Sequence, residues 1–319
     1  MGKLCGSDFA GKQYGGNLTM GFDESFLKEE TRCGFLVTEK RKKIWRTELE
    51  LLARLDEVCK KYGLSYFAEY GTMLGAVRHH GFVPWDDDID VMMFREDYMK
   101  LQEVAPTEFQ EPYFFQNTYT DLVVWGFSKL RDDRTTGIEF ADMSPDFHQG
   151  IFIDIKPFDD VPDGKEFGET ILQVQREAWQ TVANSQRMRY YVSEGVPFAL
   201  GTDILEELLN LPVRERYREF EKLNLSYAGM SERVNFIVTA ICKGLNSRKR
   251  EWYRETIDLP FEYTTVPVPA GYDEILKIQY GDYHRFVPGG SLHEHTFFDP
   301  DVPYRYYMEH PEKMTDYEI

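Results

Sequence analysis

The chain has 319 residues, of which 42% are hydrophobic and 29% charged, a composition typical of a globular protein and not of a disordered or fibrous one. Its 37 Lys and Arg against 55 Asp and Glu give a formal net charge of -18, which argues against broad binding of nucleic acid or anionic lipid. No apolar run approaches the roughly 18 residues of a membrane span, so the sequence predicts no transmembrane segment. We expect a protein of the cytoplasm, or of the inner face of the membrane.

Four segments follow one another along the chain. Residues 1–37 are rich in glycine and predict an N-terminal arm, and residues 38–165 predict a catalytic core. Residues 166–258 have apolar positions at helical spacing, which predicts a mainly helical subdomain inserted after the core. Residues 259–319 are rich in proline and tyrosine and predict an irregular C-terminal segment that wraps on the core.

The core shows alternating helix and strand signals. In 38–62, apolar positions recur at gaps of three and four residues, which predicts an amphipathic helix that ends at Gly63. The aromatic run 64–70 predicts a strand, which a Gly71–Thr72 turn joins to a helix over 73–79. Further strands are predicted over Ile89–Phe94, Leu122–Arg131 and Ile151–Lys156. This order of elements predicts an α+β fold.

An acidic run leads into the strand predicted from Ile89. Asp88 and Asp90 share a face of an extended chain, because alternate residues of a strand project the same way. Two adjacent carboxylates repel each other, and the usual relief is a divalent cation such as Mg²⁺, bound together with substrate phosphates. A solvated acidic turn is the alternative, but Trp85 on one side and an apolar run on the other favour a metal site.

Asp154 is a lone carboxylate in the apolar strand 151–156, where burial without a partner would be costly. A metal ion shared with Asp88 and Asp90 would supply that partner. Two alternatives stay open. Asp154 could be a hydrogen-bonded core residue, or Lys156, which shares its strand face, could neutralise it alone.

Phosphate groups bind to backbone amides at a glycine turn that enters a helix, and to Lys or Arg side chains. Gly71 and Thr72 provide such a turn, and Arg78 stands near the end of the helix that follows. Lys129 and Arg131 share one face of their strand and predict a clamp for a diphosphate. A solvated strand face is the alternative for these two residues.

Read together, residues 70–90 have the sequence YGTMLGAVRHHGFVPWDDDID, which closely resembles the signature of the LicD family of phosphocholine transferases. Three later blocks agree in the same order: FSKLR over 127–131, GIFIDI over 150–155, and VPAGYDEIL with YGDY over 268–283. The family is related to the fukutin group and belongs to the nucleotidyltransferase superfamily. The resemblance implies a mixed β-sheet flanked by helices, with Thr72 standing where serine is common.

The resemblance also implies a reaction: transfer of phosphocholine, or a related phospho-alcohol, from CDP-choline to a hydroxyl of a cell-surface glycan or its lipid-linked precursor, with release of CMP. The glycan would be a lipopolysaccharide or a teichoic acid. Asp88 and Asp90 would hold Mg²⁺, with Mn²⁺ as the alternative ion. Asp154 would complete the metal site or take the acceptor proton, and Lys129 and Arg131 would hold phosphate.

Choline carries a quaternary ammonium without a hydrogen-bond donor, so its recognition needs aromatic faces. Trp85 is the first candidate. Further candidates are Trp125, Tyr283, Tyr304, Tyr306 and Tyr307. Two other functions stay open: a D-x-D glycosyltransferase that uses a sugar nucleotide, and a non-catalytic glycan-binding protein.

Overall fold

The computed structural model describes residues 24–161, 167–239, 247–287, 289 and 295–315. A seven-stranded mixed sheet forms its centre, in the order β10-β9-β8-β4-β3, with β6 paired to β8 and β5 paired to β6. Its strands are β3 (Phe67–Ala68), β4 (Asp90–Phe94), β5 (Tyr113–Gln116), β6 (Ser128–Asp132), β8 (Ile151–Asp160), β9 (Arg233–Asn235) and β10 (Arg248–Lys249). The predicted α+β fold is confirmed.

The long strand β8 joins the two halves of this sheet. It pairs in parallel with β4, where Asp90 stands opposite Asp154, and antiparallel with β6, where Lys129 also stands opposite Asp154. Because side chains alternate along a strand, Ile153 and Ile155 project away from Asp154 into the main apolar core, where both are 0% exposed. Around its middle, the strand therefore presents Asp154 and Lys156 on one face and Ile153 and Ile155 on the other.

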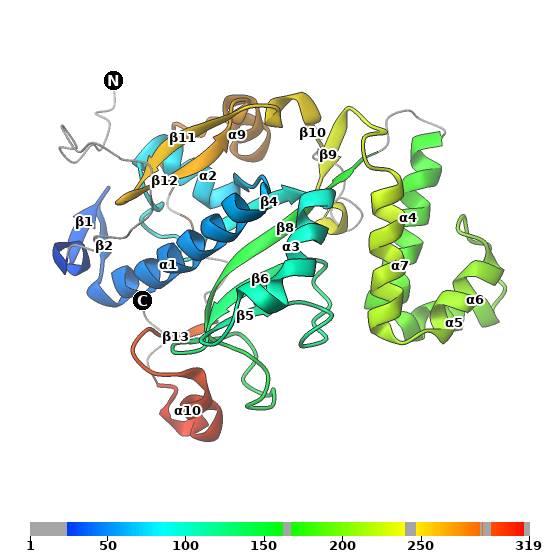
Figure 1. Cartoon of the computed structure of the whole chain (residues 1–319), viewed down its shortest axis with the longest axis horizontal. Coiled ribbons are helices and arrows are strands. Elements are labelled where there is room, and N and C mark those ends of the chain that lie inside the picture. Colours follow the sequence, from blue (N-terminus) through cyan, green and yellow to red (C-terminus); the bar gives the residue numbers. More distant parts are fainter. Residues whose placement is uncertain (1–23, 162–166, 240–246, 288, 290–294, 316–319) are drawn as a thin grey trace.

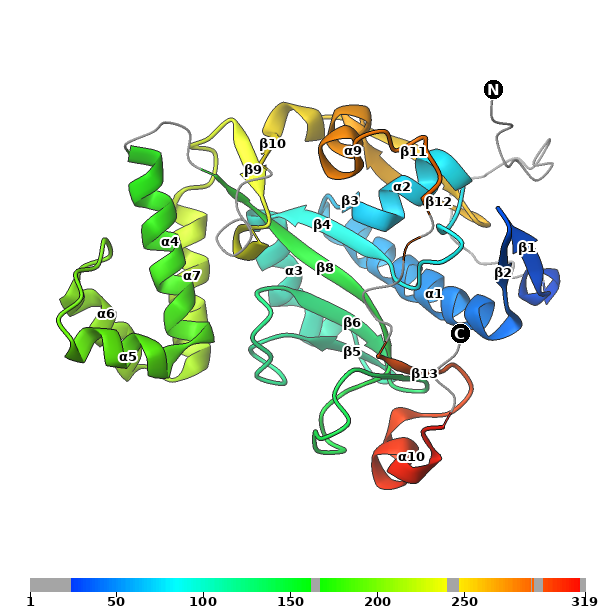
Figure 2. The ribbon, with the colours of Figure 1, turned by 180° about the vertical axis from the view of Figure 1, so that it is seen from behind.

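Helices α1 (Glu39–Tyr62) and α3 (Arg95–Glu108) lie on one face of the sheet in Figure 1, and Figure 2 shows the opposite face, with β4, β8 and β6 in front of α1. The Oγ1 atom of Thr38 caps α1 by accepting a hydrogen bond from the Arg41 N–H at 3.1 Å. Gly63, with φ 66°, ends the helix in the left-handed conformation. The helix predicted over 38–62 is confirmed.

Four helices form a separate group beside the sheet (Figure 1): α4 (Phe167–Ala183), α5 (Ser185–Ser193), α6 (Thr202–Asn210) and α7 (Val213–Ser226). Trp179, Tyr217 and Phe220 build an apolar cluster of their own between α4 and α7. This confirms the helical character predicted from residue 166 onward. The later part of that segment differs, because β9 and β10 add strands to the central sheet.

The C-terminal segment is more regular than predicted. β11 (Thr256–Phe261) and β12 (Thr264–Pro269) form an antiparallel ribbon, and α9 (Tyr272–Tyr280) packs with β11 and β12 against α2 (Tyr70–His79). A two-stranded ribbon has free edges that tolerate proline, which is why its three prolines do not prevent strand pairing. The remaining elements are β13 (Phe297–Asp299), which pairs with β7 (Thr136–Ile138), then α10 (Tyr304–Glu309) and the short 3-10 helices η2 (Arg250–Tyr253) and η3 (Pro311–Lys313).

Two further predictions changed at their boundaries. Residues 1–23 of the N-terminal arm lie outside the described residues, whereas 24–37 form the 3-10 helix η1 (Glu24–Leu27) and the hairpin of β1 (Glu30–Arg32) and β2 (Phe35–Val37). The strand predicted from Leu122 starts only at Ser128, because Leu122 and Gly126 have positive φ angles that interrupt an extended chain. In the described part of the chain, no helix has both the length and the apolarity that crossing a bilayer requires.

Candidate active site

An acidic turn, Asp86–Asp88, stands directly before β4. Carboxylate oxygens of its three aspartates lie within 4.8 Å of one another. Two side chains of α1 fix this turn, since Arg41 Nη1 and Trp45 Nε1 donate to the Asp86 carbonyl oxygen at 2.8 and 3.1 Å. Because β4 begins only at Asp90, the strand alternation by which we placed Asp88 and Asp90 on one face does not apply to Asp88. Asp88 approaches Asp90 from the turn instead.

Asp90 and Asp154 lie side by side on β4 and β8, and the Asp154 N–H donates to the Ile89 carbonyl at 2.9 Å. The Lys156 ammonium binds both carboxylates: it lies 2.8 Å from Asp154 Oδ2 and also contacts Asp90 Oδ1. On the other side, Lys129 Nζ lies 3.4 Å from Asp154 Oδ1. The structure thus shows Asp154 paired with lysine, which was one of the alternatives. The role of Asp154 as a metal ligand or a base stays a prediction.

Negative charge is concentrated at the acidic turn. Burial, followed by the charges of Asp90 and Asp86, raises the pKa of Asp88 well above its ordinary value. Burial, followed by Asp87 and Asp90, raises the pKa of Asp86 to about 6. Closely spaced carboxylate oxygens are hard donors of the kind that Mg²⁺ and Mn²⁺ bind. The three aspartates of the acidic turn therefore fit a divalent cation, and the charge of Asp90 acts on two of them.

Lys129 and Arg131 project to the same side of β6, as predicted, and both bind Glu139. Lys129 Nζ lies 2.8 Å from Glu139 Oε1, and Arg131 Nη2 lies 2.6 Å from Oε2. The alternative of a solvated strand face is wrong, since Arg131 is 0% exposed and also donates to the Gly150 carbonyl at 2.8 Å. Burial raises the pKa of Glu139, but the charges of Lys129 and Arg131 outweigh burial, so the pKa is lowered. Their phosphate-binding role stays a prediction, and Lys129, next to Asp154, is the better placed of the two.

Gly71 and Thr72 lie in the first turn of α2, and not in a turn before it, because the helix already starts at Tyr70. Thr72 Oγ1 accepts a hydrogen bond from the Asp90 N–H at 2.8 Å and so ties the helix to the start of β4. A Cβ atom on Gly71 would lie 2.0 Å from Asp86 Oδ2, so a larger residue would displace that carboxylate. The positive end of the α2 dipole therefore faces the acidic turn. Phosphate binding by Gly71 and Thr72 stays a prediction.

Arg78 stands at the opposite end of α2. Its Nη1 donates to the carbonyl oxygens of Tyr283 and Arg285 at 2.8 and 3.3 Å, which ties the helix to the C-terminal segment. Trp85 directly precedes the acidic turn and packs edge-on against His79, with ring centroids 6.3 Å apart. Trp85 is thus next to the turn, whereas Arg78 binds the chain that follows α9.

Of the other aromatic candidates, Trp125 lies beside the lysines of the site. Lys129 Nζ is 4.9 Å from the Trp125 ring centroid, and Trp125 stacks on Phe127 with centroids 5.6 Å apart. Tyr283 and Tyr304 are buried, at 4% and 0% exposure. Trp125, which is only partly buried, is therefore better placed than these tyrosines to meet a head group.

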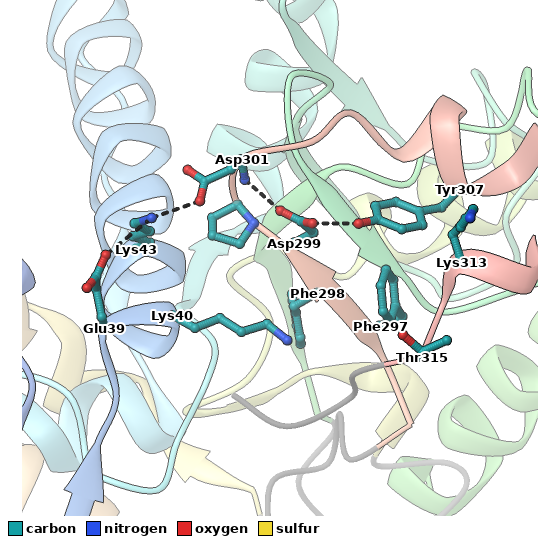
Figure 3. Close-up of a pocket in the computed structure, with 11 residues that line it drawn as sticks. Glu39, Lys40, Lys43, Phe297, Phe298, Asp299, Asp301, Tyr307, Lys313 and Thr315 are labelled. Carbon is teal, nitrogen blue, oxygen red and sulfur yellow. Dashed lines mark hydrogen bonds and ion pairs between the residues drawn. The ribbon is translucent and has the colours of Figure 1, made fainter. Parts of the chain in front are cut away.

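A separate cavity of about 420 Å³ lies between the start of α1 and the C-terminal segment (Figure 3). Two of its acids have partners in the lining: Lys43 Nζ lies 2.8 Å from Asp301 Oδ2, and the Tyr307 hydroxyl donates to Asp299 Oδ2 at 2.6 Å. The residues that line it come from α1, β13 and the chain after β13, and not from the acidic turn. This cavity is therefore not the location of the proposed chemistry.

Part of the chain that contains this site matches a known protein family. Residues 63–187 match a family model described as the LicD/FKTN/FKRP nucleotidyltransferase domain. These residues are thus similar to the LicD family. The match contains the acidic turn, Asp90, Asp154 and both lysines that flank Asp154. The resemblance seen in the sequence is confirmed, and the matched residues include most of the charged centre, although Arg41 and Glu48 of α1 lie before them.

Similarity to curated proteins extends beyond residues 63–187. The chain is 26% identical over 246 residues to the lipopolysaccharide cholinephosphotransferase LicD of Haemophilus influenzae, which covers 75% of this chain and 89% of that protein. Shorter matches are 42% identity over 57 residues to an uncharacterized protein of Rickettsia prowazekii, 18% of this chain and 21% of that protein. The mouse ribitol 5-phosphate transferase FKRP is 35% identical over 51 residues, 16% of this chain and 10% of that protein.

Three charged residues near the acidic turn and Asp154 were not among the predicted site residues. Lys156 had a signal, since it stands two residues after Asp154 on one strand. Glu48 also had one, because this acid interrupts the buried stripe of α1, where its side chain is 1% exposed. Glu139 had none: it meets Lys129 only because β6 and the chain after β7 come together in space.

Proposed function

We propose that the protein transfers phosphocholine, or a related phospho-alcohol, from a CDP-linked donor such as CDP-choline to a hydroxyl of a cell-surface glycan or its precursor. One observation carries this proposal. The acidic turn and the Asp90–Asp154 pair meet at one end of β4 and β8, inside a domain whose curated relatives are named cholinephosphotransferase and ribitol 5-phosphate transferase. The enzyme class supported by these relatives is a phosphotransferase.

The reaction we propose is an in-line displacement at the phosphorus that bears the alcohol. A new bond forms between this phosphorus and the acceptor oxygen, the bond to the CMP oxygen breaks, and the acceptor proton passes to a carboxylate. When bound, Mg²⁺ or Mn²⁺ would supply positive charge that neutralises the donor pyrophosphate. Asp88 and Asp90 would hold that ion, because Asp88 belongs to the cluster of turn carboxylates, and burial, followed by the charges of Asp90 and Asp86, raises the pKa of Asp88.

Residues of the chain itself would bind the phosphate, the acceptor hydroxyl and the head group. Lys129 lies beside Asp154 and would hold a phosphate oxygen, while Arg131 keeps Glu139 in place. Asp154 would orient the acceptor hydroxyl or take its proton. Trp125, stacked on Phe127 next to Lys129, would offer an aromatic face to a choline head group.

The test is a donor screen with the purified protein, Mg²⁺ and a glycan extract as acceptor. We expect CMP release from CDP-choline, CDP-ethanolamine or CDP-ribitol, and loss of release when a chelator is added. Release of UDP or GDP from a sugar nucleotide would instead indicate a glycosyltransferase. Binding of glycan with no nucleotide released from any donor would indicate a non-catalytic glycan-binding protein. Location in the cytoplasm stays a prediction.

A further inference from the structure

Lys156 occupies the centre of the site and has no role in the function proposed above. Its ammonium binds Asp154 Oδ2 at 2.8 Å and also contacts Asp90 Oδ1, so one cation bridges the carboxylates of two neighbouring strands. Parallel pairing places Asp90 opposite Asp154, and the alternation of β8 places Lys156 on the Asp154 face. The bridge is thus built into the register of the sheet.

Two aromatic rings also enclose this ammonium. Lys156 Nζ lies 5.6 Å from the ring centroid of Tyr70 and 5.0 Å from that of Phe127. Tyr70 has a positive φ of 47°, a conformation that costs a non-glycine residue free energy and persists only where the surroundings enforce it. With 13% of the Lys156 side chain exposed, the rings and carboxylates hold the charge in one position.

The neighbouring acidic turn brings several acids close together. Asp86, Asp87 and Asp88 bring carboxylate oxygens within 4.8 Å of one another, and the charge of Asp90 acts on Asp88. Glu48 of α1 adds a further acid. Its side chain is 1% exposed, its Oε2 has no hydrogen-bond partner among the described residues, and the charges of all three turn aspartates act on it.

Glu48 reaches this region because it shares a helix face with Arg41 and Trp45, which both donate to the Asp86 carbonyl. Two acidic groups therefore adjoin at Asp90. The Asp90–Asp154 group already contains a cation that bridges both carboxylates, whereas at the acidic turn one cation, Arg41, stands beside four acids: Asp86, Asp87, Asp88 and Glu48.

Many phosphoryl-transfer sites fill two such adjoining groups with two metal ions about 3.5 to 4 Å apart, which share a carboxylate. We propose that Lys156 takes the second of these two cation positions, so that the site binds one divalent ion, at the acidic turn and Asp90, and not two. This inference rests on the proposed function. Lys156 is then a positioning residue that keeps Asp90 and Asp154 aligned and supplies a permanent positive charge beside the donor phosphates.

The test is a count of bound Mn²⁺ by calorimetric titration and by electron paramagnetic resonance of the free ion. We expect one Mn²⁺ per wild-type chain. In Lys156→Met, we expect either a second bound Mn²⁺ or binding of the first at least about tenfold tighter, because the competing ammonium is gone. Lys156→Arg should restore one ion with wild-type affinity. Lys43→Met, which removes a lysine of the ion pair with Asp301 away from the site, is the matched control and should resemble the wild type.

Two Mn²⁺ ions per wild-type chain would overturn the inference, and so would a Lys156→Met variant with unchanged stoichiometry and affinity. If Lys156→Met does not fold, the wild-type count decides alone. The proposed function is tested apart from this: a protein that binds two Mn²⁺ and still releases CMP from a CDP-linked donor keeps the function and loses the inference. A folded wild-type chain that binds no Mn²⁺ and releases no CMP loses both.

Discussion

The strands that carry the site and the helices α4 to α7 beside them bury different kinds of side chain. On the strands, Lys129, Arg131 and Asp154 are at most 5% exposed, and each is held by ion pairs. Between the helices, Trp179 and Phe220 are at most 3% exposed and pack on other apolar residues. Burying charge costs free energy unless it is compensated, whereas apolar burial stabilises the fold directly. The strands thus bury charged side chains beside the main apolar core, whereas the cluster between the helices is apolar.

Where the helices meet the sheet, the buried side chains are charged, as they are on the strands. Arg95, at the start of α3, lies 2.7 Å from Asp159 of β8 and 3.2 Å from Glu221 of α7, and all three side chains are buried. This network attaches the helices to the sheet at the end of β8 far from Asp154. The following predictions test how separate the two regions are.

The largest effect is expected at the site itself. Asp90→Asn removes a carboxylate shared by the acidic turn and Lys156, and should lower the rate of CMP release by about 1,000-fold, roughly 4 kcal/mol on the barrier. The melting temperature should change little, because Asp154 still binds Lys156. Asp203→Asn, at an exposed position on α6, is the control. An Asp90→Asn variant with near wild-type turnover would contradict the assignment.

A substitution in the helices should lower stability and leave turnover almost unchanged. Trp179→Ala leaves a hole in the apolar cluster with Tyr217 and Phe220, and should lower the free energy of unfolding by about 3 to 5 kcal/mol in a urea titration. The rate of CMP release per folded molecule should stay within about twofold at low temperature. Trp179→Phe should cost less. A strong loss of turnover at full folding would show that the two regions are coupled.

Thr72→Val tests a link within the site. The change removes the hydroxyl that accepts the Asp90 N–H at 2.8 Å and leaves a buried donor without a partner, at a cost of about 1 to 3 kcal/mol in stability. Thr72→Ser keeps the acceptor and should behave as the wild type in both unfolding and turnover. Equal stability of the valine and serine variants would rule out this role of the hydroxyl.

Glu48→Gln should stabilise the metal-free protein. Burial, followed by the charges of Asp88, Asp87 and Asp86, raises the pKa of Glu48 well above 4.5, so its ionised form costs the folded state free energy. We expect a gain of about 1 kcal/mol at pH 8, which vanishes below pH 4.5, where the residue is protonated in both states. Melting curves at several pH values measure this. A gain that persists unchanged at pH 4 would show another cause.

The smallest effect is expected on the surface of the helices. Arg218→Ala breaks an exposed ion pair with Glu215 on α7, which should change the free energy of unfolding by no more than about 0.5 kcal/mol. The same substitution in the buried cation of the boundary, Arg95→Ala, should cost several times more, because it leaves Asp159 and Glu221 without their partner. Similar losses for both variants would contradict the contrast between surface and buried charge.

Several features could be read from the chain because their signals are local. The apolar spacing of α1, the strands around Asp90 and Asp154, and the signature over 70–90 each lie within a short stretch of sequence. Helix period and strand alternation depend only on the backbone geometry of that stretch. The acidic residues and their likeness to one family were therefore available without coordinates.

The tertiary structure alone decided how the charges are paired. Glu139 meets Lys129 and Arg131, Arg41 holds the carbonyl of Asp86, and Lys156 of β8 reaches Asp90 of β4. Arg41 and Asp86 are 45 residues apart, and Lys156 and Asp90 are 66 apart. Even Lys129 and Glu139, 10 residues apart, meet only where the chain after β7 returns to β6, so these contacts depend on sheet register and on how the elements dock. No local pattern contains that information, because a buried charge selects its partner by distance in space and not by position in the sequence.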